Sequence, residues 1–211
     1  MKILAHRGYW NQDIEKNSPE ALRTALEKGF GFESDVRDYM ERMVISHNIA
    51  TSACQDAEEV FQWLHEFNDE YCFAINIKAD GLKDILQSYF KKFSISNYFL
   101  FDMSIPQMVE FNEMGLRFFT RQSEVEPNPN MYDKAAGVWI DGFWRTDWIT
   151  KELLDRHINN GKEVCLVSPD LHGKKNYKEF WQQLLDDGID LNKVILCTDY
   201  PEEARVFFNE K

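Results

Sequence analysis

Two carboxylates in an otherwise apolar segment are the first candidates for chemistry. The segment Phe32–Val36 reads Phe-Glu-Ser-Asp-Val, so Glu33 and Asp35 are two residues apart. Residues two apart in a β-strand point to the same face, and in a barrel that face can line an active site at the carboxyl end of the strand. Two inward carboxylates need a cation, and hard divalent ions such as Mg²⁺ and Ca²⁺ take oxygen ligands. The pair therefore indicates half of a metal site, unless it lies on a solvent-facing strand edge.

Two histidines flank this pair along the chain. His6 ends the first apolar segment, and His47 ends a short hairpin after the second. Phosphodiester chemistry needs a base to activate a nucleophile, an acid to protonate the leaving oxygen, and positive charge on the phosphoryl oxygens. Two histidines, Arg7 and a metal ion are such a set. Taken alone, each histidine is more often a hydrogen-bonded structural residue.

A third segment, Ile75-Asn76-Ile77-Lys78, carries two polar residues on one face. Strand alternation places Asn76 and Lys78 together, while the isoleucines pack outward against helices. A lysine on the inner face of a barrel strand is costly unless it is paired or used. Lys78 is therefore a candidate phosphate-binding residue, the alternative being a surface lysine at the end of the strand.

These residues lie at the ends of apolar stretches that alternate with amphipathic stretches along the whole chain. The expected strands are Ile3–His6, Phe32–Val36, Phe73–Lys78, Tyr98–Asp102, Leu116–Arg121, Gly137–Asp141, Glu163–Val167 and Lys193–Thr198. The expected helices are Pro19–Lys28, Ala57–Phe67, Leu82–Phe93, Ile105–Met114, Thr150–Asn159, Lys178–Asp187 and Pro201–Asn209.

This alternation predicts the fold class. Eight strand–helix units in 211 residues indicate a lean α/β protein, a (β/α)8 TIM barrel forming one domain over residues 1–211. The Asp38–Arg42 turn into Met43–Ser46 predicts a short hairpin on the second strand and not a ninth barrel strand. A doubly wound open sheet is the alternative, because a strand count does not show closure.

Charge and hydropathy exclude several classes of partner. The chain has 24 Lys and Arg against 36 Asp and Glu, a net charge of −12. Such a field repels polyanions and lacks the basic patch of a nucleic-acid binder, so an anionic substrate must be captured locally. The apolar start is too short for a signal peptide, and no apolar run approaches the ~18 residues of a membrane span. We therefore expect a cytoplasmic protein with no nucleic-acid partner and no integral membrane segment.

Taken together, the motifs resemble the glycerophosphodiester phosphodiesterase family of the phospholipase-C-like barrel superfamily. The similar segments follow in the same order from the first strand to the last: His6-Arg7-Gly8, Asn17-Ser18, Glu33-Ser34-Asp35-Val36, Val44-Ile45-Ser46-His47, Ile77-Lys78 and Thr198-Asp199-Tyr200-Pro201. The resemblance implies a TIM barrel in lipid metabolism whose general acid and base are His6 and His47. It also implies a divalent metal, Mg²⁺ or Ca²⁺, on Glu33 and Asp35.

The chain departs from the family pattern in three places. Asn76 stands where the family has a third carboxylate ligand, and its neutral amide oxygen predicts weak metal binding. Lys16 stands where the family usually has glutamate, with Glu15 one residue away. The insertion that normally follows the second histidine is missing, because His47-Asn48 is followed almost at once by a helix. Since that insertion roofs the substrate site, the substrate need not be a glycerophosphodiester.

The residues therefore predict a metal-dependent phosphodiesterase that hydrolyses a small glycerophosphodiester-like or sugar or polyol phosphodiester. The roles predicted are His6 and His47 as acid and base, Arg7 and Lys78 on the phosphate, and Glu33, Asp35 and Asn76 on the metal. A non-catalytic barrel that binds a phosphorylated ligand or a protein partner is one alternative. A phosphodiester lyase that forms a cyclic phosphate is another, because two histidines also serve intramolecular attack.

Four further polar residues are weaker candidates, because each follows a predicted strand where the catalytic loops of a barrel begin. They are Asp102, Glu124, Asp141 and His172. Each is equally explained as a loop hydrogen-bonding residue or a solvated charge.

Overall fold

The computed structural model describes residues 1–209, in which strands and helices alternate in the predicted order. The strands are β1 (Lys2–His6), β2 (Gly31–Tyr39), β3 (Arg42–Ile45), β4 (Phe73–Ile77), β5 (Tyr98–Phe101), β6 (Phe119–Ser123), β7 (Gly137–Asp141), β8 (Glu163–Val167) and β9 (Val194–Thr198). The α-helices are α1 (Pro19–Glu27), α2 (Ala57–Glu66), α3 (Lys83–Phe93), α4 (Ile105–Glu113), α5 (Lys151–Asn159), α6 (Tyr177–Asp186) and α7 (Pro201–Asn209). Two short 3₁₀-helices, η1 (Pro169–His172) and η2 (Leu191–Lys193), precede α6 and β9.

The strand order confirms the predicted fold class. Hydrogen-bonded neighbours follow the order β5-β4-β2-β1-β9-β8-β7-β6. An isolated parallel bridge also joins Leu100 of β5 to Phe118, the residue before β6. This is the α/β fold of a (β/α)8 TIM barrel, and the doubly wound alternative is wrong. The strand β3 lies off this path and pairs with β2, antiparallel, as the predicted hairpin requires.

One strand–helix unit has no helix, in the stretch between Leu116–Arg121 and Gly137–Asp141 where none was expected. Among the described residues, β6 runs into β7 through an irregular segment, residues 124–136. This segment contains Pro127 and Pro129, which lack the N–H group that a helix interior needs. Side chains of β6 hold it instead: Thr120 Oγ1 donates to Asn130 O (2.7 Å) and Gln122 Nε2 donates to Pro127 O (2.8 Å). The strand β6 also begins at Phe119 and not at Leu116 as expected.

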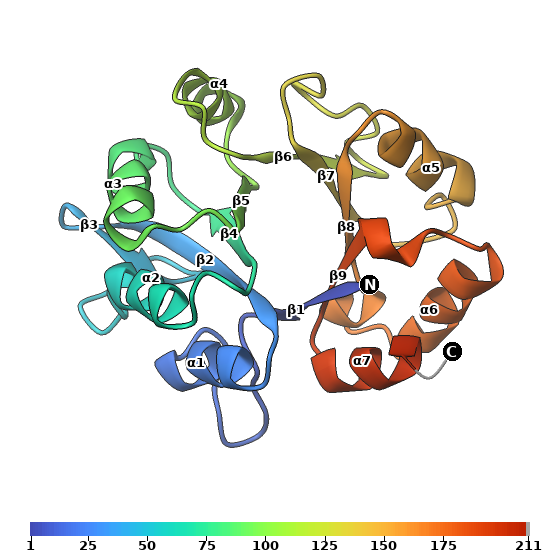
Figure 1. The fold of residues 1–211 in the computed structure, drawn as a ribbon, viewed down its shortest axis with the longest axis horizontal. Coiled ribbons are helices and arrows are strands. Elements are labelled where there is room, and N and C mark those ends of the chain that lie inside the picture. Colours follow the sequence, from blue (N-terminus) through green and yellow to red (C-terminus); the bar gives the residue numbers. More distant parts are fainter. Residues whose placement is uncertain (210–211) are drawn as a thin grey trace. The chain divides into compact units, whose positions relative to one another are not determined.

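The chain divides into two compact units, so the predicted single domain stays a prediction. The N-terminal unit is Ala5–Phe118, and the C-terminal unit combines Met1–Leu4 with the residues from Phe119 onward. In the N-terminal unit, α1, α2 and α3 lie side by side next to β2 and β4 (Figure 1). The core beneath them is aromatic, and the ring of Phe73 contacts those of Phe32 and Phe61.

In the C-terminal unit the core lies between β7–β9 and the helices α5–α7. Trp181 of α6 is its largest fully buried side chain, and its Nε1 donates to Ser168 Oγ (2.9 Å). Branched residues such as Val138 and Leu196 fill the strands, as expected for parallel strands that are covered on both faces.

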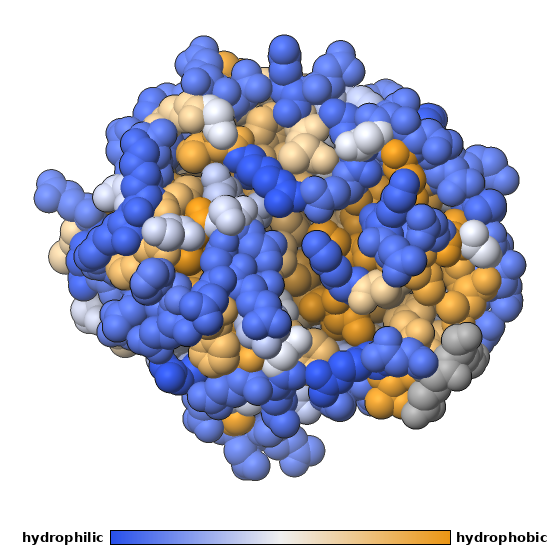
Figure 2. Space-filling model, viewed as in Figure 1, coloured by the Kyte–Doolittle hydropathy of each residue, from blue (hydrophilic) through white to orange (hydrophobic). Residues whose placement is uncertain are grey.

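Hydrophilic side chains make up most of the visible surface over α1, α2 and α3 (Figure 2). Within residues 1–209, none of the helices combines the length and the apolar character needed to cross a bilayer.

A buried histidine lies in the core of the C-terminal unit. His157 of α5 is 2% exposed, with Nδ1 2.9 Å from the Tyr132 hydroxyl and Nε2 2.8 Å from Gln122 Oε1. Because Gln122 Oε1 is an acceptor, Nε2 donates and Nδ1 accepts, which is the neutral form of the ring. Burial lowers the pKa of His157 from 6.5 to about 4, with a smaller contribution from the Arg156 charge.

This histidine makes stability depend on pH. Its folded-state pKa lies below its unfolded value, so its contribution is complete above pH 6.5 and is lost as pH falls toward 4. We expect the free energy of unfolding in urea to fall over this range more steeply for wild type than for His157→Gln. Parallel curves for the two proteins would contradict the assignment of the neutral form.

Candidate active site

Polar side chains of the N-terminal unit meet where β2 and β4 end. The two strands are parallel and in register, with Asp35 opposite Asn76. All three polar side chains here are removed from water: Glu33 is 2%, Asp35 0% and Asn76 8% exposed. A buried carboxylate is tolerated only when it is paired or protonated, so its partners define the site.

Asp35 is surrounded by positive charge. Its Oδ1 lies 3.3 Å from Lys78 Nζ, and its Oδ2 lies 3.2 Å from Arg7 Nε. Asn17 Nδ2 also donates to Oδ2, at 2.8 Å. These partners come from the segment after β4 and from the loop between β1 and α1. The carboxylate therefore joins three parts of the chain at one point.

Glu33 has weaker partners. The backbone N–H of Arg7 donates to Glu33 Oε2 at 3.3 Å, and His6 Nε2 lies 3.8 Å from the same oxygen, beyond hydrogen-bond length. Burial, and to a smaller extent the Asp35 charge, raise the pKa of Glu33 to about 8. The charges of Arg7 and Lys78 and a hydrogen bond from Asn76 oppose this rise only in part.

The loop after β1 takes its shape from close backbone packing. Arg7 and Gly8 both have left-handed backbone conformations, with φ of 56° and 86°. A Cβ atom on Gly8 would lie 2.5 Å from the carbonyl carbon of Ala21, so only glycine fits between this loop and α1. The N–H of Tyr9 donates to Ala21 O (2.8 Å), which fixes the approach.

The residue that sequence reasoning missed is Asn17. The motif Asn17-Ser18-Pro19 reads as a helix start, and Ser18 Oγ does accept the N–H of Ala21 (3.1 Å). The side-chain amide of Asn17 instead contacts two residues of β2. It donates to Asp35 and accepts from Ser34 Oγ (2.8 Å). The signals in the sequence were its place just before a helix cap and in the Asn17-Ser18 motif, and neither named a partner.

Lys16, the predicted departure, lies with its Nζ 4.1 Å from the centre of the Trp10 ring. A cation over an indole face is favourable, and this contact explains how the loop accommodates a lysine. Glu15 is exposed and lines the neighbouring cavity.

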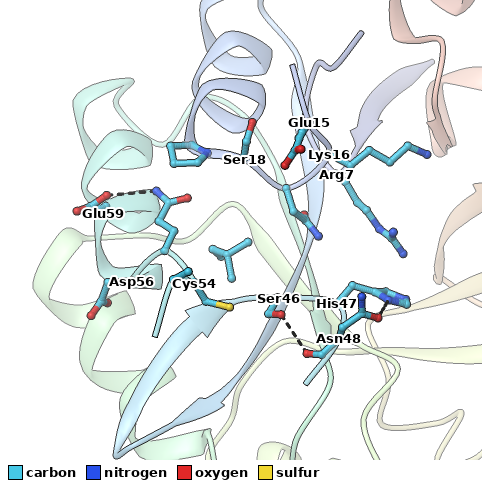
Figure 3. Close-up of a pocket in the computed structure, with 15 residues that line it drawn as sticks. Arg7, Glu15, Lys16, Ser18, Ser46, His47, Asn48, Cys54, Asp56 and Glu59 are labelled. Carbon is cyan, nitrogen blue, oxygen red and sulfur yellow. Dashed lines mark hydrogen bonds between the residues drawn. The ribbon is translucent and has the colours of Figure 1, made fainter. Parts of the chain in front are cut away.

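A cavity of about 730 Å³ opens beside the cluster (Figure 3). Arg7 and His47 lie on one side of it, and Cys54, Asp56 and Glu59 lie on the other. The hairpin β2–β3 places His47, since the N–H of Ser46 donates to Asp35 O at 3.0 Å.

The predicted site residues thus fall into two groups. His6, Arg7, Glu33, Asp35, Asn76 and Lys78 form one contact network. His47 stands apart from this network. It is exposed, with Nδ1 3.2 Å from Asn48 Oδ1, and it lines the cavity together with Arg7.

The donor atoms fit a divalent cation poorly. Both oxygens of Asp35 face Lys78, Arg7 or Asn17, so an ion would have to displace these groups. No cluster of three or more His, Cys, Asp or Glu side chains suited to a metal occurs within residues 1–209. Asn76 Oδ1 is buried without a hydrogen-bond partner among the same residues; Asp35 Oδ1 also lacks one but lies 3.3 Å from Lys78 Nζ. Metal binding by Glu33, Asp35 and Asn76 therefore stays a prediction.

Three weaker candidates belong to the C-terminal unit. Glu124 accepts the backbone N–H groups of residues 143–145; burial raises its pKa, but these hydrogen bonds hold it below its usual value. Asp141 Oδ1 lies 2.6 Å from His172 Nε2. These contacts explain Glu124 as a loop-holding residue.

Comparisons with known proteins give a likeness of structure alone. No family model matches the chain, and no curated protein matches it in sequence. A solved glycerophosphodiester phosphodiesterase from Parabacteroides distasonis superposes with a TM-score of 0.68 at 16% identity, covering 99% of this chain and 97% of its own. The chain shares its fold.

Two other solved structures agree. A glycerophosphoryl diester phosphodiesterase from the same organism has a TM-score of 0.73 at 14% identity, over 99% of this chain and 86% of its own. A glycerophosphodiester phosphodiesterase from Agrobacterium tumefaciens has a TM-score of 0.67 at 15% identity, over 99% of both chains. At these identities the likeness supports the barrel fold over the whole chain, and it shows nothing about the reaction.

The missed residue gives a prediction about stability. Asn17→Ala leaves the buried carboxylate of Asp35 with one donor fewer, so we expect a loss of about 1–3 kcal/mol in the free energy of unfolding. Asn192→Ala, at an exposed position, is the control and should change little. Equal midpoints of urea unfolding for the two variants would show that the Asn17 hydrogen bond contributes nothing.

Proposed function

We propose that the chain is a phosphodiesterase that hydrolyses a small phosphodiester in the cavity beside Arg7. The observation that carries this proposal is the pairing of Arg7 and Lys78 with one buried carboxylate, next to His6. Two cations held at one point match the oxygens of a phosphoryl group, and a histidine nearby can move a proton. The shared fold of solved phosphodiesterases supports the same reaction class.

In the proposed reaction, Arg7 and Lys78 bind the non-bridging oxygens of the phosphodiester. One histidine takes a proton from water as its oxygen attacks phosphorus, and the other gives a proton to the leaving oxygen as the P–O ester bond breaks. The products are a phosphomonoester and an alcohol. Glu33 Oε2 lies 3.8 Å from His6 Nε2, which places this carboxyl group beside the ring.

A non-catalytic, phosphoester-binding barrel is the second candidate. Asn76 supports it, because a metal-dependent phosphodiesterase of the resembled family would have a carboxylate there. His47 also supports it, since its ring is exposed and touches Asn48 instead of the carboxylates.

Removing either histidine separates the two candidates. His6→Ala and His47→Ala should each lower the turnover of bis(p-nitrophenyl) phosphate or glycerophosphocholine by about 10²–10⁴-fold, because each loses a proton-transfer group. His65→Ala is the matched control: His65 contacts Phe93 O in the helical layer and should turn over as wild type does.

Circular dichroism establishes that the variants fold, and phosphorus NMR of the product separates hydrolysis from cyclisation. Full turnover in both folded variants would contradict the roles of the histidines. No turnover of any phosphodiester by wild type would favour the non-catalytic candidate.

A further inference from the structure

The positive charge of the site comes from side chains of the chain itself. Arg7 and Lys78 are the two cations nearest the buried carboxylates, and each lies within 3.3 Å of an Asp35 oxygen. Asp35 is fully buried, whereas the side chains of Arg7 and Lys78 are 25% and 23% exposed. The cations are therefore accessible while the carboxylate beneath them is not.

We propose that Arg7 and Lys78, held by Asp35, supply the positive charge for phosphate binding, so that the site works without a divalent cation. This inference rests on the proposed phosphodiesterase function and departs from the metal requirement that the family resemblance implies. In it, Asp35 is a positioning residue: it orients the two cations and contacts no substrate atom.

The donors available on these cations support this role. The Nε atom of Arg7 lies 3.2 Å from Asp35 Oδ2 and its backbone N–H donates to Glu33, so the guanidinium fork still has its two Nη groups for an anion. Lys78 Nζ carries three N–H donors and lies 3.3 Å from Asp35 Oδ1, so it can face Asp35 and an anion at the same time. Arg7 also lines the 730 Å³ cavity, so an anion entering the cavity meets its guanidinium.

The charge count agrees with this assignment. One carboxylate, Asp35, pairs with two cations, Arg7 and Lys78, so positive charge is in place before any ion binds. A carboxylate at position 76 would add a negative charge that a bound cation would offset. Asn76 adds none. Its Oδ1 stays open for a donor on the substrate, such as a hydroxyl group.

The first measurement is the turnover of a phosphodiester after dialysis against EDTA and with EDTA present. We expect wild type to keep the activity that it has with Mg²⁺, Ca²⁺ or Mn²⁺. Asn76→Asp should become sensitive to EDTA and bind Mn²⁺ in titration calorimetry, because it restores the third carboxylate. Activity of wild type that EDTA abolishes and Mg²⁺ or Ca²⁺ restores would overturn this inference and leave the phosphodiesterase function intact.

The second measurement needs no turnover and uses inorganic phosphate as the probe. In EDTA, phosphate should bind wild type, and Lys78→Gln and Arg7→Gln should weaken its binding by about tenfold or more, the loss of a charge-assisted hydrogen bond. The control is Lys91→Gln. It removes an exposed lysine of α3 whose Nζ donates to Gln87 Oε1. If Arg7→Gln does not fold, Arg7→Lys takes its place in the measurement, because this variant keeps the positive charge.

The two measurements separate the two proposals. If wild type cleaves no phosphodiester under any condition, the proposed function fails, and phosphate binding in EDTA decides the charge assignment. Binding that depends on Arg7 and Lys78 supports it. Phosphate binding that requires a divalent cation, or no phosphate binding at all, overturns it.

Discussion

The ion pairs of one fully buried carboxylate organise the N-terminal unit. Asp35 would cost several kcal/mol if it were charged and unpaired in the protein interior, so the fold must bring it partners. It receives Lys78 from the end of β4, Arg7 from the loop after β1, and Asn17 from the residues before α1. Removing one partner is more damaging than the weak net value of a buried ion pair suggests, because the remaining charge stays buried.

The same carboxylate explains why Lys78 is tolerated on an inward strand position. The sequence showed that an inward lysine must be paired or used, and the structure provides the pair. Register decides the partner: Asp35 lies opposite Asn76, so the residue two positions beyond Asn76 reaches Oδ1 from the neighbouring strand. A shift of one residue in that register would turn Asn76 and Lys78 to the opposite face and leave Asp35 buried beside apolar side chains.

Much of this fold follows from sequence periodicity. Gly137–Asp141 and Glu163–Val167 have the predicted bounds, because apolar runs bounded by turn residues mark buried parallel strands. Periodicity failed where apolar residues precede the true strand, as at Leu116. The face shared by Glu33 and Asp35 also follows from alternation. Contacts between distant segments do not follow from periodicity, because Asn17 and Asp35 are 18 positions apart and no pattern links them.

The start of α1 shows how three adjacent residues take three separate roles. Lys16 extends over Trp10, Asn17 turns to Asp35 and Ser34, and Ser18 caps the helix. Asn17 has a left-handed φ of 60°, a conformation that asparagine adopts more easily than most residues. That turn lets one side chain point into the cluster while its neighbour points away from it. Because the N–H of Asn17 also donates to Arg7 O at 2.9 Å, the helix start and the arginine are fixed by the same residue. A change in the α1 cap therefore reaches Arg7 through one amino acid.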